Sequence, residues 1–230
     1  YQCDADIVGS TSLLNEIELV EIYAVVFRKL NVRVEICINN RKLLTALANI
    51  CNLSERVQEI TTVIDKLDKI GLEKVIESLR NKNIPKDALR IIETFLAIGG
   101  ENKEKLVLLE SLLGDDPEGK AGLKDLKYIL EMLPGNISVK IEPQLARGLN
   151  YYTGAIFEVK ALDVEMGSIG GGGRYDDLTG LFGVPNVPGV GISFGVDRIY
   201  DVMETLNIFP EEMKKNVQVL FFNTGENECK

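Results

Sequence analysis

Residues 137–195 contain four strand-like runs in close succession: ISVKIEP (137–143), AIFEVKAL (155–162), EMGSIGG (165–171) and VPGVGISFG (187–195). Segments rich in glycine and polar residues separate these runs, which is typical of strands joined by loops and tight turns. A helix is expected to begin near Val196, directly after the last run. This part of the chain therefore predicts a sheet.

The rest of the chain has a strand-rich beginning and a helical middle. Residues 1–8 (YQCDADIV) alternate as a strand does, an amphipathic pattern at 13–30 follows the capping sequence at 9–12, and VRVEICIN (32–39) predicts a second strand. From 41 to 133, leucine and isoleucine recur at three- and four-residue spacing, which predicts a string of short helices. We therefore expect a sheet domain of the α+β class that hosts an all-helical insertion.

The composition excludes several classes of function. The 230 residues are 45% hydrophobic and carry a net charge of −9, which argues against a diffuse basic surface that binds phosphates. The chain has no histidine, so imidazole-based triads and His-ligated metals are excluded within it. The cysteines are scattered, no apolar run is long enough to span a membrane, and no signal peptide is recognisable. These features predict a reducing, cytoplasmic location.

The most conspicuous motif is GSIGGGGRYDDLTGLFG at 167–183. Consecutive glycines let a backbone approach a ligand closely and adopt positive φ. The glycine spacing in this region fits neither a P-loop nor the dinucleotide-binding GxGxxG cradle. The simpler interpretation is a tight turn, but Arg174-Tyr175-Asp176 directly after the glycines favours a binding site.

A second motif, RGLNYYTG at 147–154, precedes a predicted strand. The Arg147 guanidinium is a natural partner for a carboxylate or phosphate. Tyr151 and Tyr152 can form a pocket wall that is both apolar and hydrogen-bonding. The alternative is a loop arginine in a surface ion pair, with the tyrosines as ordinary sheet packing.

Two further groups of side chains could hold a ligand. Gln2, Asp4 and Asp6 alternate along one strand and therefore share one face, which suits a cationic or amine-bearing ligand. Arg198 is expected in the first turn of a helix, where a cation opposes the helix dipole and so suggests a bound anion. The alternatives are a solvated strand face and a surface arginine.

Together and in this order, these segments resemble the histidyl-tRNA synthetase family of class II aminoacyl-tRNA synthetases. YQCDADIVGS (1–10) is similar to the second strand of class II motif 2, and GVGISFGVDRIYDVM (189–203) is similar to motif 3. RGLNYYTG resembles the family's histidine-specific arginine signature, and GGGGRYDDL (170–178) resembles its second histidine-specific signature. The resemblance implies an antiparallel sheet of the class II type, flanked by helices.

The resemblance also implies a division of the chain. Residues 1–40 and 134–215 would form the catalytic core, 41–133 the helical insertion domain, and 216–230 the start of an anticodon-binding domain. Motif 1, which builds the dimer interface, and the motif 2 arginine would precede Tyr1. We therefore expect the 230 residues to be a fragment that is inactive alone. The full-length enzyme is expected to be a homodimer.

Roles for individual residues are implied in the same way. Arg147 would contact the histidine carboxylate and the ATP α-phosphate, and Arg198 would hold the ATP phosphates, with Gly195 also at the ATP site. Gln2 would bind the substrate amino acid, and Asp6 would accept a hydrogen bond from the imidazole. The rest of the histidine pocket would be formed by Tyr151, Tyr152, Gly171, Gly172 and Tyr175. Mg²⁺ would bridge the ATP phosphates and would not occupy a metal site of the protein.

The activity that the resemblance implies is the ATP-dependent conversion of L-histidine to histidyl-adenylate and its transfer to histidine tRNA in protein synthesis. The alternative is the histidine-sensing regulatory subunit of ATP phosphoribosyltransferase, a catalytically inactive relative of this fold. That relative typically lacks the aminoacylation arginines and the insertion. The presence of Arg147, Arg198 and a long helical block therefore favours the ligase.

Overall fold

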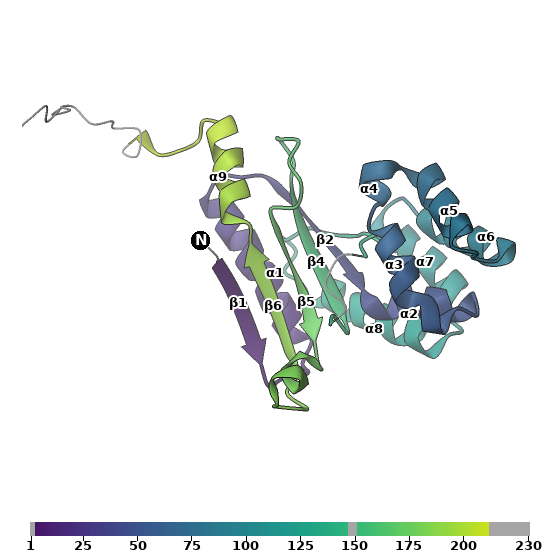
Figure 1. Cartoon of the computed structure of the whole chain (residues 1–230). Coiled ribbons are helices and arrows are strands. Elements are labelled where there is room, and N and C mark those ends of the chain that lie inside the picture. Colours follow the sequence, from purple (N-terminus) through teal and green to yellow (C-terminus); the bar gives the residue numbers. More distant parts are fainter. Residues whose placement is uncertain (1–2, 147–150, 212–230) are drawn as a thin grey trace, which may run out of the picture.

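A computed structural model describes residues 3–146 and 151–211, which contain one six-stranded sheet (Figure 1). In chain order the strands are β1 (Cys3–Val8), β2 (Val34–Asn40), β3 (Val139–Ile141), β4 (Ala155–Ala161), β5 (Gly170–Tyr175) and β6 (Gly189–Phe194). Across the sheet the order is β1-β6-β5-β4-β2-β3, and every neighbouring pair is antiparallel except β2–β3. The expected α+β fold with an antiparallel sheet is confirmed, with one parallel pair at the edge.

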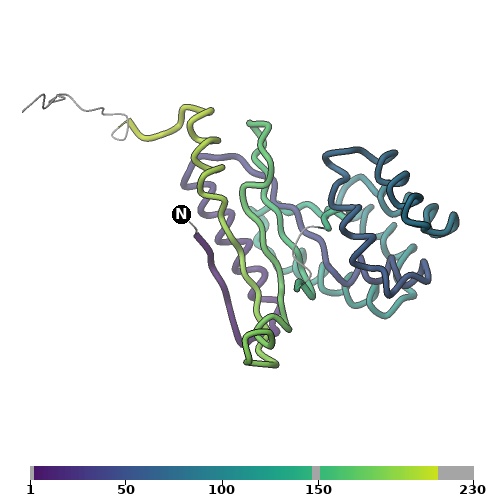
Figure 2. Tube along the Cα trace, in the orientation of Figure 1, coloured from purple at the N-terminus to yellow at the C-terminus, as the bar shows by residue number. Residues whose placement is uncertain are grey.

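Helix α1 (Leu14–Lys29) packs along one face of the sheet, as the tube in Figure 2 also shows. Its buried residues recur at helical spacing and include Tyr23 and Phe27. The Tyr23 hydroxyl lies 3.0 Å from the carbonyl oxygens of Gly171 and Ser193. Its ring packs edge-on against Phe194, with the ring centroids 5.0 Å apart. This helix therefore holds the two central strands β5 and β6 in place.

The helices between β2 and β3 gather beside one edge of the sheet (Figure 1). They are α2 (Arg41–Ile50), η1 (Ser54–Arg56), α3 (Val57–Ile64), α4 (Leu67–Ile70), α5 (Leu72–Asn81), α6 (Lys86–Leu96), α7 (Asn102–Leu113) and α8 (Pro117–Met132). Two side chains of α7 form hydrogen bonds with the backbone of β3. The Asn102 amide donates to the Val139 carbonyl and accepts from the Ile141 N–H. The Lys105 ammonium donates to the Ile141 carbonyl at 2.7 Å. The block therefore satisfies backbone groups at the sheet edge. The domain boundaries at 41 and 133 stay predictions.

Two predicted helices match the structure, and one predicted strand is misplaced. The helix expected at 13–30 is α1, and α9 (Val196–Thr205) begins at the expected residue. The strand expected at 165–171 instead occupies 170–175, so the four consecutive glycines form strand and not a turn, and none of them has positive φ. Residues 216–230, expected to begin an anticodon-binding domain, lie outside the described residues. Among the helices at 3–146 and 151–211, none is long and apolar enough to cross a bilayer.

Candidate functional site

A cavity of about 230 Å³ lies over β1, β6 and β5, on the face of the sheet opposite α1. Asp4 and Asp6 line this cavity, whereas Ala5 and Ile7 pack into the core, because side chains alternate along a strand. Across the strand pair, Asp6 lies opposite Gly191. The cavity therefore has a strongly acidic side formed by a single strand.

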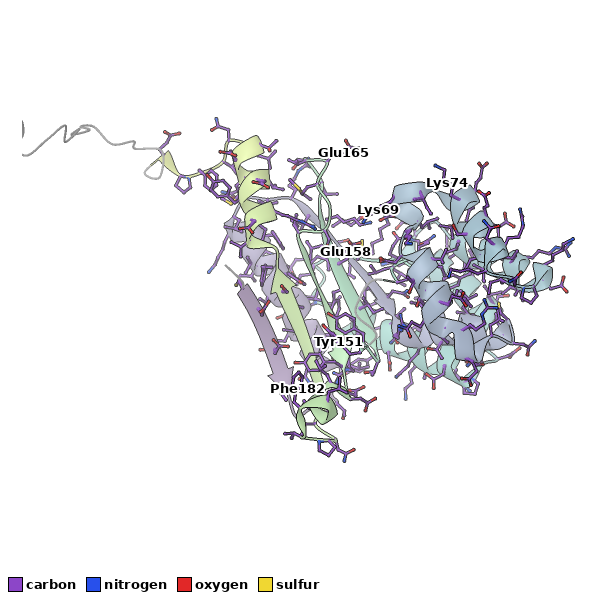
Figure 3. The ribbon with its side chains drawn as sticks, in the orientation of Figure 1. Lys69, Lys74, Tyr151, Glu158, Glu165 and Phe182 are labelled. Carbon is purple, nitrogen blue, oxygen red and sulfur yellow. The ribbon has the colours of Figure 1, made fainter. Side chains whose placement is uncertain are left out.

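Three tyrosines, Tyr151, Tyr152 and Tyr175, line the same cavity. The ring centroids of Tyr151 and Tyr152 are 4.7 Å apart, and those of Tyr151 and Tyr175 are 6.4 Å apart. In Figure 3, Tyr151 lies over the lower half of the sheet, above the η2 turn (Leu178–Phe182). These rings form an aromatic wall that faces the two carboxylates.

A short hydrogen bond joins the wall to the acidic side. The Tyr175 hydroxyl donates to Asp6 Oδ1 at 2.6 Å. Burial, together with the neighbouring Asp6 carboxylate, raises the pKa of Tyr175 above its ordinary value of 10.0, so the phenol remains a donor at neutral pH. Within the described residues, Asp6 Oδ2 makes no hydrogen bond. One carboxylate oxygen is therefore held in place and the other can accept a proton donor from a ligand.

Glycines in β5 and β6 make room for these side chains. A Cβ at Gly173 would lie 3.0 Å from the Tyr152 ring, and one at Gly189 would overlap the Tyr175 ring. A Cβ at Gly191 would overlap Asp6 Oδ1. The glycines therefore allow aromatic rings and a carboxylate to lie flat against the sheet. Their consecutive run suggests positive φ angles, but their role here is to leave out a Cβ.

A second cavity, of about 430 Å³, adjoins the first, and Gly171 and Ser193 line both. Gly195 and Arg198 also line the second cavity. The exposed Arg198 guanidinium donates to the Ser168 carbonyl at 2.6 Å. No carboxylate in the described ranges forms an ion pair with it. Its charge is therefore available to an anionic ligand.

The adjacent residues Arg174 and Tyr175 point to opposite faces of β5. Tyr175 lines the first cavity, whereas Arg174 is only 6% exposed and pairs with the buried Glu16 of α1. The Nε–Oε1 distance in this ion pair is 2.5 Å. The binding interpretation of Arg174-Tyr175-Asp176 therefore fits Tyr175, while Arg174 connects the sheet to the helix.

The structure places eight of the residues to which the family resemblance gives a role around the two cavities. The first cavity contains Asp6, Tyr151, Tyr152, Gly171, Gly172 and Tyr175, and the second contains Gly195 and Arg198 together with Gly171. Gln2 and Arg147 lie outside the described residues. Asp4 also lines the first cavity, on the strand face that it was predicted to share with Asp6. The other residues that line the first cavity, to which sequence reasoning gave no role, are Leu178, Gly191, Ile192 and Ser193. The alternating glycines at 189 and 191 are the one signal that could have identified this part of β6. No cluster of three His, Cys, Asp or Glu that could hold a metal occurs among the described residues.

Comparison with known proteins gives a consistent set of matches. The family profile described as histidyl-tRNA synthetase matches residues 1–199. The chain is 50% identical over 232 aligned positions to the histidine–tRNA ligase of Porphyromonas gingivalis, and this match covers 100% of the chain. The crystal structure of histidyl-tRNA synthetase from Nostoc sp. PCC 7120 superposes with a TM-score of 0.83 at 33% identity, covering 91% of this chain and 51% of that one.

The fold alone is also shared with a structure from Bacillus halodurans described as an ATP phosphoribosyltransferase regulatory subunit/histidyl-tRNA synthetase. That match has a TM-score of 0.74 at 19% identity and covers 90% of this chain and 53% of that one. The chain spans about half the length of the curated relative from P. gingivalis, 51% of it.

Proposed function

This chain belongs to the histidyl-tRNA synthetase family, and we propose that the full-length protein activates L-histidine with ATP and transfers it to histidine tRNA. In the first step the histidine carboxylate attacks the α-phosphorus of ATP, giving histidyl-adenylate and pyrophosphate. In the second step a ribose hydroxyl at the tRNA 3′ end displaces AMP. The observation that carries this proposal is the pair of adjoining cavities, one acidic and aromatic and the other lined by an exposed arginine.

The first cavity suits histidine. An imidazole N–H can donate to Asp6 Oδ2, because the Tyr175 hydroxyl already occupies Oδ1. Tyr151 and Tyr152 offer the ring apolar and edge contacts. In family terms Gln2, from the same region as Asp6, would bind the amino acid, and Gly171 and Gly172 would complete the pocket.

The second cavity suits the phosphates of ATP. Arg198 would hold them beside Gly195. In family terms, Arg147 would contact both the histidine carboxylate and the α-phosphate. Adenylate formation needs no acid or base from the protein, since the carboxylate is already a nucleophile and pyrophosphate is the leaving group. Catalysis then consists of positioning the reactants and neutralising the charge that develops.

The remaining partners are proposed from family membership. Mg²⁺ would accompany ATP and bridge its phosphates. The full-length protein would act as a homodimer in the cytoplasm.

We assign the tRNA contact to the helical block, at a basic corner that we call the Pro85 cluster: Arg80, Lys82, Lys86 and Arg90. All four side chains are exposed, on α5, on α6 and between these helices. Lys82 pairs with Glu59 at 3.2 Å and Arg90 with Asp87 at 3.7 Å, so half of the charge is locally balanced. Arg80 and Lys86 are the members best placed to meet the tRNA backbone.

The decisive test is ATP–pyrophosphate exchange by the full-length protein with each amino acid in turn. Exchange with histidine alone, followed by charging of histidine tRNA, would support the proposal. Histidine binding without exchange would instead indicate the regulatory relative of ATP phosphoribosyltransferase. Exchange with another amino acid would contradict the assignment of the pocket.

A further inference from the structure

One buried arginine connects the segments that carry the side chains of the pocket. A guanidinium has five N–H donors, and every one of those of Arg174 has an acceptor. Nε and Nη2 bind the two carboxylate oxygens of Glu16 at 2.5 and 2.7 Å. The remaining donors reach the carbonyl oxygens of Ser10 and Ser12 at 3.2 and 3.3 Å, and Asp176 Oδ1 at 3.4 Å. With its donors fully used, Arg174 fixes the chain around it and has none left for a ligand.

The partners of Arg174 lie next to residues of the first cavity. Ser10 and Ser12 belong to the connection that follows β1, the strand that carries Asp6. Asp176 directly follows Tyr175. The guanidinium therefore joins the strand that holds the acidic side of the cavity to the strand that holds one of its tyrosines, from the opposite face of the sheet.

Thr153 extends this network to the other two tyrosines, which it directly follows in the chain. Its hydroxyl lies 2.7 Å from Asp176 Oδ2 and 3.1 Å from the Asp176 backbone nitrogen, so it donates to the carboxylate and accepts from the N–H. Its backbone N–H donates to the Arg174 carbonyl at 2.8 Å. Tyr151 and Tyr152 precede β4 and belong to no strand. Their placement therefore depends on how Thr153 is held.

Gly154 shows how closely the two motifs fit together. A Cβ at this position would lie 3.0 Å from Cδ and 3.2 Å from Cβ of Arg174. The glycine of RGLNYYTG therefore leaves room for the aliphatic part of Arg174, which belongs to the other motif. The two signatures are interlocked on the α1 side of the sheet, behind the cavity that they line.

We propose that Arg174, Asp176 and Thr153 are positioning residues, which set Tyr151 and Tyr152 against Tyr175 and so determine the affinity for histidine without touching it. This inference rests on the proposed function of the first cavity. Aromatic walls contribute to binding when they are held in place before the ligand arrives, since ordering them on binding costs affinity. The cavity around Arg198 has no lining residue in this network, so ATP binding should be spared.

The substitution Thr153→Val in the full-length protein tests the proposal, because valine keeps the branched shape and loses the hydroxyl. In histidine-dependent pyrophosphate exchange, the KM for histidine should rise about tenfold, which corresponds to about 1.4 kcal/mol. The KM for ATP and the unfolding midpoint should stay near those of the wild type. Thr153→Ser keeps the hydroxyl and should restore the KM for histidine.

A matched control is Thr94→Val. The Thr94 hydroxyl donates to the Arg90 carbonyl at 2.9 Å on α6, and Thr94 lines neither cavity. This substitution should leave both KM values unchanged. Asp176→Ala should resemble Thr153→Val, and adding Thr153→Val to it should cost little more, because both changes remove the same hydrogen bond.

If the wild-type protein catalyses histidine-dependent exchange, either of two results would overturn the inference and leave the proposed function standing. One is a KM for histidine in Thr153→Val within about twofold of the wild type. The other is an equal rise in the KM for histidine and for ATP, which would mean general loosening of the fold. A wild-type protein without histidine-dependent exchange would overturn the proposed function and the inference with it. The two failures are therefore distinguishable.

Discussion

Replacing Gly191 with alanine should damage the histidine pocket while leaving the fold nearly intact. Gly191 lies opposite Asp6 on the neighbouring strand, and a Cβ there would overlap Asp6 Oδ1 and lie 2.6 Å from its Cγ. The carboxylate must then turn away, so the 2.6 Å hydrogen bond from Tyr175 and the bond proposed to the imidazole are both lost. Because Asp6 is a short and exposed side chain, it can move without displacing β6.

The expected change in the KM for histidine follows from the loss of the hydrogen bond proposed between the imidazole and Asp6. Hydrogen bonds to charged groups contribute about 1.5–3 kcal/mol. At about 1.4 kcal/mol per tenfold, the KM for histidine should rise roughly 10- to 150-fold.

Histidine-dependent pyrophosphate exchange by the full-length protein measures this KM, and thermal unfolding reports the fold. Gly135→Ala is the matched control, because a Cβ at Gly135 would meet nothing within 4 Å and the residue lines neither cavity. An unchanged KM for histidine in Gly191→Ala would refute the reasoning, since the ligand would then not depend on the Asp6 carboxylate in this position. A large fall in the unfolding midpoint would also count against it, because the overlap would then be relieved by the strand.

Three further predictions concern other parts of the molecule. Arg147→Ala in the full-length protein should slow adenylate formation by about 10²- to 10³-fold and weaken ATP binding much less, because such a donor counters charge that grows in the transition state. Single-turnover kinetics and a direct measurement of ATP binding test this prediction. An equal loss in rate and in ATP affinity would contradict the role of Arg147. Tyr23→Phe should lower the free energy of unfolding at pH 7, measured with urea, by about 1–3 kcal/mol, because the two part-buried carbonyl oxygens that share the hydroxyl proton lose their donor. Burial raises the pKa of Tyr23 in the folded protein above its ordinary value of 10.0. The contribution of this hydroxyl to the free energy of unfolding is therefore complete below pH 10 and is lost as the pH rises towards the pKa of the folded state. The difference in this free energy between wild type and Tyr23→Phe should narrow above pH 10, and a difference that stays constant to pH 11 would argue against this explanation. Reversing the four charges of the Pro85 cluster should reduce aminoacylation while histidine-dependent exchange stays near normal, and the wild-type advantage should shrink as salt rises; equal losses in the two assays would assign the cluster a structural role.

Features that depend on neighbours in the chain could be predicted from the sequence. The alternation of residues 3–8 predicts that Asp4 and Asp6 share a face, and both line the same cavity. The helical spacing at 13–30 locates α1 to within a residue at each end. The order of the four motifs predicts the family, because each motif is a short string that can be recognised without any knowledge of its contacts.

The grouping of site residues was predicted through that family resemblance and not through spacing. Asp6 and Tyr175 are 169 positions apart, yet a 2.6 Å hydrogen bond joins them. No local pattern specifies such a contact. It exists because β1 and β5 both pair with β6 and place these two side chains on one face.

Only the tertiary structure determined what the glycines and Arg174 do. The glycine run suggests turns with positive φ, but it forms a strand whose missing side chains leave space for tyrosine rings and for neighbouring backbone. Arg174 stands beside a pocket tyrosine in the sequence and faces the other way in the fold, where it meets Glu16, which is 158 positions distant. Residue type and local periodicity predict which face of an element is apolar. Which atoms lie across from a given glycine or guanidinium depends on strand pairing and helix packing, and these are set by contacts between segments that are far apart in the chain.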